Sequence, residues 1–406
     1  MTSAIPASFP RFVRAFFAAL AVMLAACAGL TLAVDPYGLF GTRLLPSRMF
    51  PKTERMSFGA DRSLKAIEIA RLEKGGALVL GSSRVAVGID PEEPSLRDLG
   101  LYNAGLLNGT MRENVAVADY AVRHAAPKRL IWALDHELYA ADMNPQTDYA
   151  LSPFAGGGVA AAWVRATLST KALTAAWRVA RRIPRRINTD ATLRGWSRVT
   201  AWGEGRALDW AGAFRSEFRG FAATPPGMGL DADAADAAFE AALRRFVAAG
   251  VAVDLAINPR YVWRLEATEQ LGRWADYEAW KRRLAAIAAR VSRETGRPVR
   301  LFDFDVAGPI TTEALRPGVS VERPRYFQET SHYRSVVGSV LVNRVLGRPI
   351  PPGFEAFGME ITPATIEAHL AEARRAFEAW RRAEPDVVRD VHSLLEEARR
   401  STAAAS

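Results

Sequence analysis

The sequence contains very little cysteine or histidine: one cysteine, Cys27, and five histidines in 406 residues. A disulfide within the chain is therefore excluded, and cysteine usage does not identify the compartment. The Cys and His spacing of a structural zinc site is also absent, and neither a metal nor another cofactor is predicted. Internal repeats and long low-complexity linkers are missing too, which favours one large domain with appendages.

One stretch, Ala15–Val34, has no charged residue over 20 positions. At ~1.5 Å per residue, a helix of this length spans ~30 Å, the thickness of the hydrocarbon core of a bilayer. No face of the segment is polar, which argues against a buried helix of a soluble protein. We therefore predict that residues 15–34 form a transmembrane anchor and that residues 1–14 are a cytoplasmic N-terminus.

The charges beside this stretch predict its orientation. Arg11 and Arg14 precede it, and the α-amino group adds a third positive charge; Asp35 follows it, and only Arg43 and Arg48 come soon after. Positive flanks stay on the cytoplasmic side, so we expect a single-pass protein of the cytoplasmic membrane with its N-terminus inside. The rest of the chain is then exported to the periplasmic side.

A cleaved leader is the alternative to a retained anchor. Residues 24–27 read Leu-Ala-Ala-Cys, which resembles a bacterial lipobox and would make Cys27 a lipidated N-terminus. However, the apolar run continues through Leu30 and Leu32, beyond that cleavage point. We favour the uncleaved anchor, and lipoprotein processing stays open as the second interpretation.

The exported part alternates helical patterns with short apolar runs, which is typical of a parallel sheet covered by helices on both faces. The expected fold class is therefore α/β. Strands are expected at residues 77–80, 99–102, 129–134, 251–257 and 299–304, and helices at 61–73, 113–124, 239–248 and 274–295.

The predicted α/β domain covers residues 35–350. Residues 140–229 interrupt its rhythm, because they are rich in Arg, Trp and Ala and read as an insertion of helices and loops. Residues 351–406 are expected to form C-terminal helices, with Pro385 between the last two.

The net charge of +9 is unevenly distributed. The stretch Arg165–Arg206 holds ten Lys and Arg residues against two acids, Asp190 and Glu204. Two interpretations stay open: this region binds an acidic glycan or anionic lipid headgroups, or it is a solvated pair of basic helices. Nucleic acid is not expected as a partner of an exported domain.

Two short motifs contain groups suited to catalysis. Ser83 follows the predicted strand 77–80 through the turn at Gly81, and ligands bind at the carboxyl ends of parallel strands. Alternatively, Ser83 caps the next helix. In the second motif Glu329 lies three residues before His332, so it can hold the imidazole Nδ1–H and leave Nε2 free to take a proton. The alternative is an exposed helix start.

Together these motifs resemble the SGNH/GDSL hydrolase superfamily, and in particular its membrane-anchored branch that serves acylation of envelope polymers. The resemblance covers residues 10–350 outside the insertion. It is carried by Gly-Ser-Ser-Arg at 81–84, Asn-Ala-Gly-Leu-Leu-Asn-Gly at 103–109, Glu-Thr-Ser-His at 329–332, Asp-Pro-Tyr-Gly-Leu-Phe at 35–40, and Trp-Lys at 280–281 with Leu-Phe-Asp-Phe at 301–304.

The resemblance implies a flavodoxin-like three-layer domain with Ser83 as nucleophile, His332 as general base, and Glu329 where the family usually has Asp. The implied oxyanion hole uses the N–H groups of Ser83 and Gly109. The family's asparagine is missing, because residues 134–137 read Leu-Asp-His-Glu, and Asn108 is the candidate replacement.

The implied function is a serine esterase or O-acyltransferase acting on an envelope ester or polysaccharide. The alternative is a catalytically weak SGNH-like protein that binds or assembles an envelope polymer, because losing one oxyanion donor can cost ~3 kcal/mol of transition-state stabilisation.

The remaining histidines have simpler interpretations. His124 lies late in a predicted helix, and His369 and His392 lie on predicted C-terminal helices that are rich in charge. All three are expected to be solvated surface groups. Residues 135–137, Asp-His-Glu, form either a second acid/base site or the end of a strand beside the cleft, and the second interpretation is favoured.

Overall fold

The computed structural model describes residues 9–40, 61–139, 148–181, 187–191, 194–202, 210–223, 232–314 and 324–405. Its main unit is a six-stranded sheet in the order β2-β1-β3-β6-β7-β8, with β8 antiparallel to its neighbour and the others parallel. The strands are β1 Ala77–Leu80, β2 Leu101–Asn103, β3 Arg129–Leu134, β6 Ala252–Ile257, β7 Arg300–Asp303 and β8 Met359–Ile361. The expected α/β class is confirmed.

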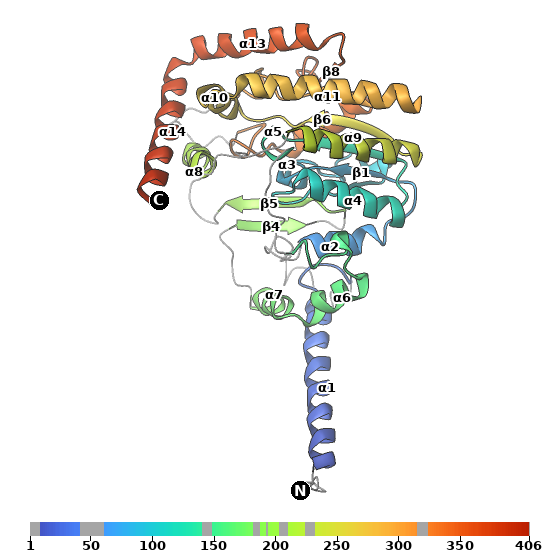
Figure 1. The fold of residues 1–406 in the computed structure, drawn as a ribbon. Coiled ribbons are helices and arrows are strands. Elements are labelled where there is room, and N and C mark those ends of the chain that lie inside the picture. Colours follow the sequence, from blue (N-terminus) through green and yellow to red (C-terminus); the bar gives the residue numbers. More distant parts are fainter. Residues whose placement is uncertain are drawn as a thin grey trace, which may run out of the picture.

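Helices flank this sheet, and a separate antiparallel pair, β4 Ile187–Ala191 and β5 Ser197–Trp202, lies outside it (Figure 1). The helices are α1 Phe9–Val34, α2 Asp61–Ile69, α3 Ser83–Gly88, α4 Met111–His124, α5 His136–Tyr139, α6 Val159–Leu168, α7 Thr170–Ala180, α8 Trp210–Ala223, α9 Ala232–Ala248, α10 Val262–Gln270, α11 Trp274–Thr295, α12 Ser335–Val345, α13 Ile366–Ala383 and α14 Pro385–Ala405.

The five parallel strands, counted along the chain, lie in the doubly wound order 2-1-3-4-5. The connection from β1 to β2 runs in one direction across the sheet. The connections from β2 to β3, from β3 to β6 and from β6 to β7 run in the opposite direction. Right-handed crossovers therefore put α3 on one face and α4, α9 and α11 on the opposite face, where they lie side by side (Figure 1). The direction reverses beside β1, and such a switch point is where doubly wound sheets bind ligands.

The strands lie in the core because both of their faces are covered. All of β1 and β2 is buried, as are all but the first residue of β3, β6 and β7. Trp132 on β3 packs edge-on against Phe239 of α9, with ring centroids 5.0 Å apart. Full burial of such a side chain contributes about 1.5–3 kcal/mol, which explains why the strands read as continuous apolar runs.

Several boundaries differ from the sequence-based expectation. The strand expected from residue 99 begins at Leu101, because residues 97–99 form a 3-10 turn that ends at Gly100 with a positive φ of 56°. Strand β8 lies within the C-terminal segment that was expected to be helical. Its three residues are too few to show a periodicity.

The C-terminal helices reach back to the insertion. Helix α14 begins at Pro385, as predicted, and packs against α8 and α10. Two ion pairs join α14 to α8, from Arg215 to Asp390 at 2.7 Å and from Arg219 to Glu397 at 3.3 Å. The C-terminus therefore fixes one helix of the insertion beside the main domain.

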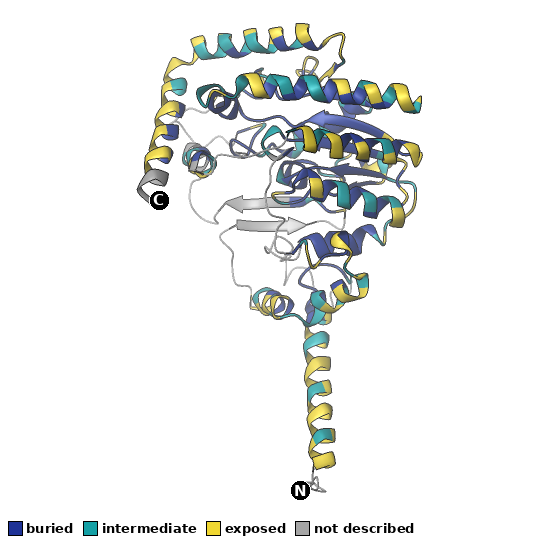
Figure 2. Cartoon of the chain, in the orientation of Figure 1, coloured by how far each residue is buried: buried dark blue, intermediate teal, exposed yellow. Residues whose placement is uncertain are grey.

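Helix α1 is long and apolar enough to span a membrane. Most of its length is exposed and extends away from the domain (Figures 1 and 2). Its buried side chains are Thr31 and Val34, in the last turn, where α6 and α7 contact it. Cys27 is a half-buried free thiol one turn earlier.

Candidate active site

The turn after β1 depends on glycine. Gly81 has a positive φ of 157°, and a Cβ atom there would lie 2.4 Å from the Val85 side chain and 2.9 Å from the Ala133 carbonyl. A larger residue would push the turn away from α3 and β3.

Ser82 is the N-cap of α3, because its side chain accepts a hydrogen bond of 3.2 Å from the Arg84 N–H. The capping role that the sequence left open for Ser83 therefore belongs to its neighbour. Ser83 is the first residue of α3, and its hydroxyl remains available for another partner.

That partner is His332, 249 residues away in the chain. Ser83 Oγ lies 2.8 Å from His332 Nε2, and Glu329 Oε1 hydrogen-bonds the opposite ring nitrogen, Nδ1. Glu329 also accepts the backbone N–H groups of Ser331 at 2.8 Å and of His332 at 3.0 Å. The predicted meeting of these three side chains is present in the structure, with Ser83 and His332 half-buried.

The charges favour an ionised Glu329 beside a basic imidazole. Burial alone would raise the pKa of Glu329, but His332 and the hydrogen bonds lower it to about 2. Burial would likewise lower the pKa of His332, yet the Glu329 carboxylate outweighs it and raises that pKa. A neutral His332 with its proton on Nδ1 can then accept the Ser83 proton at Nε2.

A second carboxyl group, Glu217 of α8, lies behind this arrangement and was missed by the sequence analysis. It accepts a hydrogen bond from the Thr330 hydroxyl and pairs with Arg264, whose Nε donates to the same hydroxyl at 3.1 Å. Burial and the nearby Glu329 raise the pKa of Glu217 to about 7. Only the packing of α8 brings it here, so no local motif indicates it.

Arg84 joins the nucleophile turn to the neighbouring loops. Its guanidinium lies 2.5 Å from both Asp135 Oδ1 and Glu137 Oε2, and its Nε donates to the Ser331 carbonyl at 3.1 Å. Burial opposes ionisation of Glu137, but Arg84 and other arginines hold its pKa far below the ordinary range. Asp135 and Glu137 are therefore ion-pair partners at a strand end, as favoured from the sequence.

His136, between them, is not poised for acid/base work either. Burial lowers the pKa of His136 to about 3, so its ring is neutral. The ring packs against Tyr277 and Trp280, with centroids 5.3 and 5.2 Å away.

The oxyanion donors implied by the resemblance differ in whether they are available to a substrate. The Gly109 N–H donates to the Leu106 carbonyl at 3.0 Å, and Asn108 is exposed with a positive φ of 50°. The Ser83 N–H lies in the first turn of α3, where an N–H has no acceptor within its own helix. Asp135 occupies the end of β3, and its carboxylate accepts from Asn258 Nδ2 at 3.1 Å and cannot donate.

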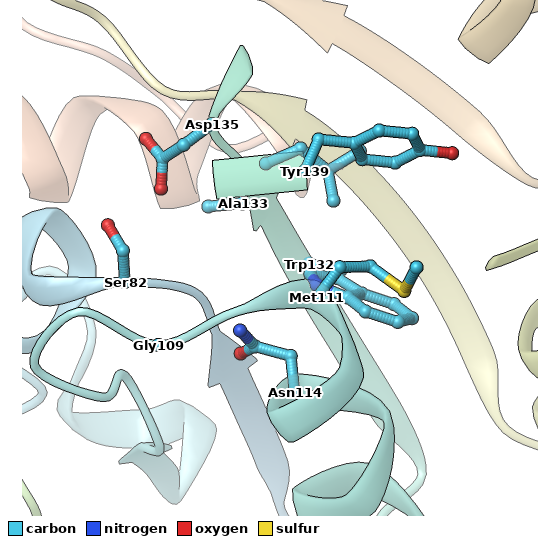
Figure 3. Close-up of a pocket in the computed structure, with 9 residues that line it drawn as sticks. Ser82, Gly109, Met111, Asn114, Trp132, Ala133, Asp135 and Tyr139 are labelled. Carbon is cyan, nitrogen blue, oxygen red and sulfur yellow. The ribbon is translucent and has the colours of Figure 1, made fainter. Parts of the chain in front are cut away.

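A cavity of about 10 Å³ lies beside this strand end (Figure 3). Figure 3 shows Ser82 and Asp135 facing one another across it, and Asn114 of α4 pointing toward Gly109. Asn114 Nδ2 donates to the Thr110 carbonyl at 2.8 Å, while its buried Oδ1 has no hydrogen-bond partner among the described residues. The volume corresponds to about one water molecule, which would satisfy this amide.

The histidine predictions were correct in two cases. His124 and His392 are exposed. The prediction for His369 was wrong: its Nε2 lies 2.8 Å from Asp303 Oδ2, a carboxylate that also accepts from buried Lys281 at 2.6 Å. Helix α13 packs against α11 and brings this histidine over the end of β7, an arrangement that its own helical pattern does not reveal.

Within the described ranges, no group of three or more His, Cys, Asp or Glu side chains could hold a metal ion. Comparison with protein-family models, with curated proteins and with solved structures found no match. The SGNH resemblance therefore rests on the motifs, and the chemistry has to be argued from the side chains.

Proposed function

We propose that the protein is a membrane-anchored SGNH-type serine enzyme that acts on an ester outside the cytoplasmic membrane. The observation that supports it is the hydrogen-bonded series Ser83–His332–Glu329 at the switch point of a doubly wound sheet. With water as acceptor the enzyme is an esterase. With a sugar hydroxyl of an envelope polysaccharide as acceptor it is an O-acyltransferase.

In the proposed reaction, Ser83 Oγ attacks the acyl carbonyl while its proton passes to His332 Nε2. Glu329 stabilises the imidazolium that forms. Collapse of the tetrahedral intermediate breaks the ester bond, and His332 returns the proton to the departing alcohol. The acceptor hydroxyl then attacks the acyl-serine, gives its proton to His332, and the same proton finally restores Ser83.

Fluorophosphonate labelling of the full-length protein in detergent tests the nucleophile without a known substrate. We expect one labelled peptide, containing Ser83, and no labelling of Ser83→Ala or His332→Ala. Ser339→Ala, which removes a hydroxyl that donates to the Ser335 carbonyl within α12, is the matched control and should label normally. Normal labelling of the Ser83→Ala protein would show that the nucleophile assignment is wrong.

The proposed location combines α1 with its flanking Arg11 and Arg14. A C-terminal alkaline phosphatase fusion should be active, whereas activity of a cytoplasmic reporter at the same point would reverse the orientation. Mass spectrometry of the membrane form should recover an intact N-terminal peptide. A mature N-terminus at a diacylglyceryl Cys27 would instead support the lipoprotein alternative.

A binding or assembly protein is the second candidate, and a specific observation favours it. The Gly109 N–H is already engaged, and Asp135 cannot replace the family's asparagine as a donor. A protein of this class would resist the fluorophosphonate although Ser83 and His332 are intact, and cells with the Ser83→Ala variant would have the same envelope properties as wild-type cells.

A further inference from the structure

The exposed apolar side chains are concentrated near α1. Outside that helix, four large apolar side chains are exposed among the described residues. Three of them belong to residues 151–181, here called the collar segment: Leu151 at 57%, Val164 at 55% and Trp177 at 51%. The fourth is Met359 of β8, at 50%. The collar segment contains α6 and α7, which flank the end of α1 where it joins the domain (Figure 1).

The fully buried residues of the collar helices are small, whereas Val164 and Trp177 are exposed. Four buried alanines pack with Tyr37, Leu39, Leu64 and Ile67: Ala162, Ala166, Ala172 and Ala175. Trp163 packs partly buried against the same cluster. A helix on the surface of a soluble protein normally has its large apolar residues on the buried side. The outward position of Val164 and Trp177 is therefore suited to apolar surroundings.

The part of α1 that α6 and α7 contact indicates how deep these two helices lie in the bilayer. Thr31 and Val34 are buried, and Cys27 and Ala28 are half-buried, so the collar covers roughly Cys27–Val34, or ~12 Å of helix. These residues are the end of the uncharged run that spans ~30 Å. When that run fills the hydrocarbon core, α6 and α7 lie at the depth of about 5–10 Å where interfacial helices bury their apolar faces.

The charge of the segment fits a lipid surface. The collar segment contains no Asp or Glu and four basic residues, Arg165, Lys171, Arg178 and Arg181. The Arg181 guanidinium lies over the Trp177 ring, 4.3 Å from its centroid. Aromatic rings and basic side chains in such proximity are characteristic of the interface, where the ring faces the acyl chains and the cation faces the phosphates.

We propose that the collar segment is a membrane-interface element that lies at the boundary between headgroups and acyl chains in the leaflet where α1 leaves the bilayer. Val164 and Trp177 face the acyl chains, and the basic side chains contact the lipid phosphates. The proposal rests on the membrane anchorage of α1 proposed above. In this position the collar segment holds the domain at a fixed height and tilt relative to the membrane, which a single anchor helix would not do.

Spin labels on single cysteines in the full-length protein test this proposal. Cys27 is replaced by Ala, and labels are introduced by Val164→Cys and Trp177→Cys in separate variants. Met359→Cys is the matched control, an exposed apolar position on the sheet, and Val22→Cys, 70% exposed on α1, reports on the anchor. All four side chains are exposed, so the substitutions leave the core intact.

The proteins are reconstituted into vesicles of phosphatidylcholine and phosphatidylglycerol, and each label's accessibility is measured by power saturation. Molecular oxygen concentrates in the bilayer and a nickel chelate stays in water. Labels at 22, 164 and 177 should be more accessible to oxygen, and the label at 359 to the nickel chelate. If 164 and 177 behave like 359 while 22 is in lipid, the collar proposal is wrong and the anchor stands. If 22 also behaves like 359, the anchorage itself fails.

Discussion

Replacing Glu217 with Gln keeps the size of the side chain and removes its charge beside Glu329. The pKa of Glu217 rises from 4.5 to about 7, because the carboxyl is buried and faces a second carboxylate. Between these two pH values the folded protein keeps a proton on Glu217 that the unfolded chain has released. Folding stability therefore depends on pH in this window.

The sign follows from which state binds the proton. The raised pKa contributes stability that is fully present below about pH 4.5 and is lost as the pH rises through about 7. At about 1.4 kcal/mol per pH unit, the loss amounts to at most ~3 kcal/mol. The side chain is 22% exposed, so solvent screening reduces this figure. The Glu217→Gln variant has no such proton to lose.

Thermal unfolding of the wild type and of Glu217→Gln, followed from about pH 5 to about pH 8, measures this difference. As the pH rises, the melting temperature of the variant should increase relative to that of the wild type. At higher pH the difference between the two melting temperatures should become constant. Glu372→Gln on α13, whose carboxylate is 70% exposed, is the control and should follow the wild type. Parallel curves for the wild type and Glu217→Gln would refute the assigned protonation of Glu217.

The same substitution should alter the site chemistry. An ionised Glu217, present above about pH 7, helps to raise the pKa of His332, so Glu217→Gln should lower that pKa and leave more neutral imidazole in this pH range. The acid limb of the fluorophosphonate labelling rate should then move to lower pH. A merely structural Glu217 would change the yield of folded protein and leave this limb in place.

Four single substitutions test the remaining contacts. Ser83→Ala and His332→Ala should each remove nearly all labelling, and the double variant should label no less than either, because the two residues act as one unit. Glu329→Gln should slow labelling less, since a neutral amide still orients the ring but stabilises the imidazolium poorly; equal loss in all three variants would contradict this order. Lys281→Met leaves Asp303 without its buried ammonium partner at 2.6 Å and should destabilise the fold by about 3–5 kcal/mol, seen as a lower melting temperature.

The parts of the fold predicted correctly are those where a long pattern and a turn signal agree. The strands at 77–80 and 129–134 and the helix at 274–295 have the predicted bounds, because apolar runs or a helical periodicity end at glycine or proline nearby. The meeting of Ser83 with His332 also followed from pattern, since both motifs come after strands whose carboxyl ends share one edge of the sheet.

The parts that were missed depend on packing between distant segments. Glu217 reaches the site because α14 holds α8 in position, and His369 contacts Asp303 because α13 packs over the end of β7. Neither contact leaves a local signal, since each residue lies on a helix with an ordinary polar pattern. The helix cap is likewise assigned to Ser82 by its hydrogen bond with the Arg84 N–H. The sequence alone does not distinguish Ser82 from Ser83 as the capping residue.

The two proposed functions differ in how they account for the carboxylates around His332. Glu329 is buried and ionised, and Glu217, a carboxyl group whose pKa is raised to about 7, lies nearby. Burying an ionised carboxylate is expensive, and a protein that only binds a polymer could hold the same loop with apolar side chains of similar volume. A Glu–His pair whose free nitrogen points at a half-buried serine is instead the arrangement that the proposed proton transfer requires. The carboxylates therefore favour the proposed enzyme over the binding protein, and Asp135 in place of the family's asparagine would slow the proposed reaction without removing the groups that carry it out.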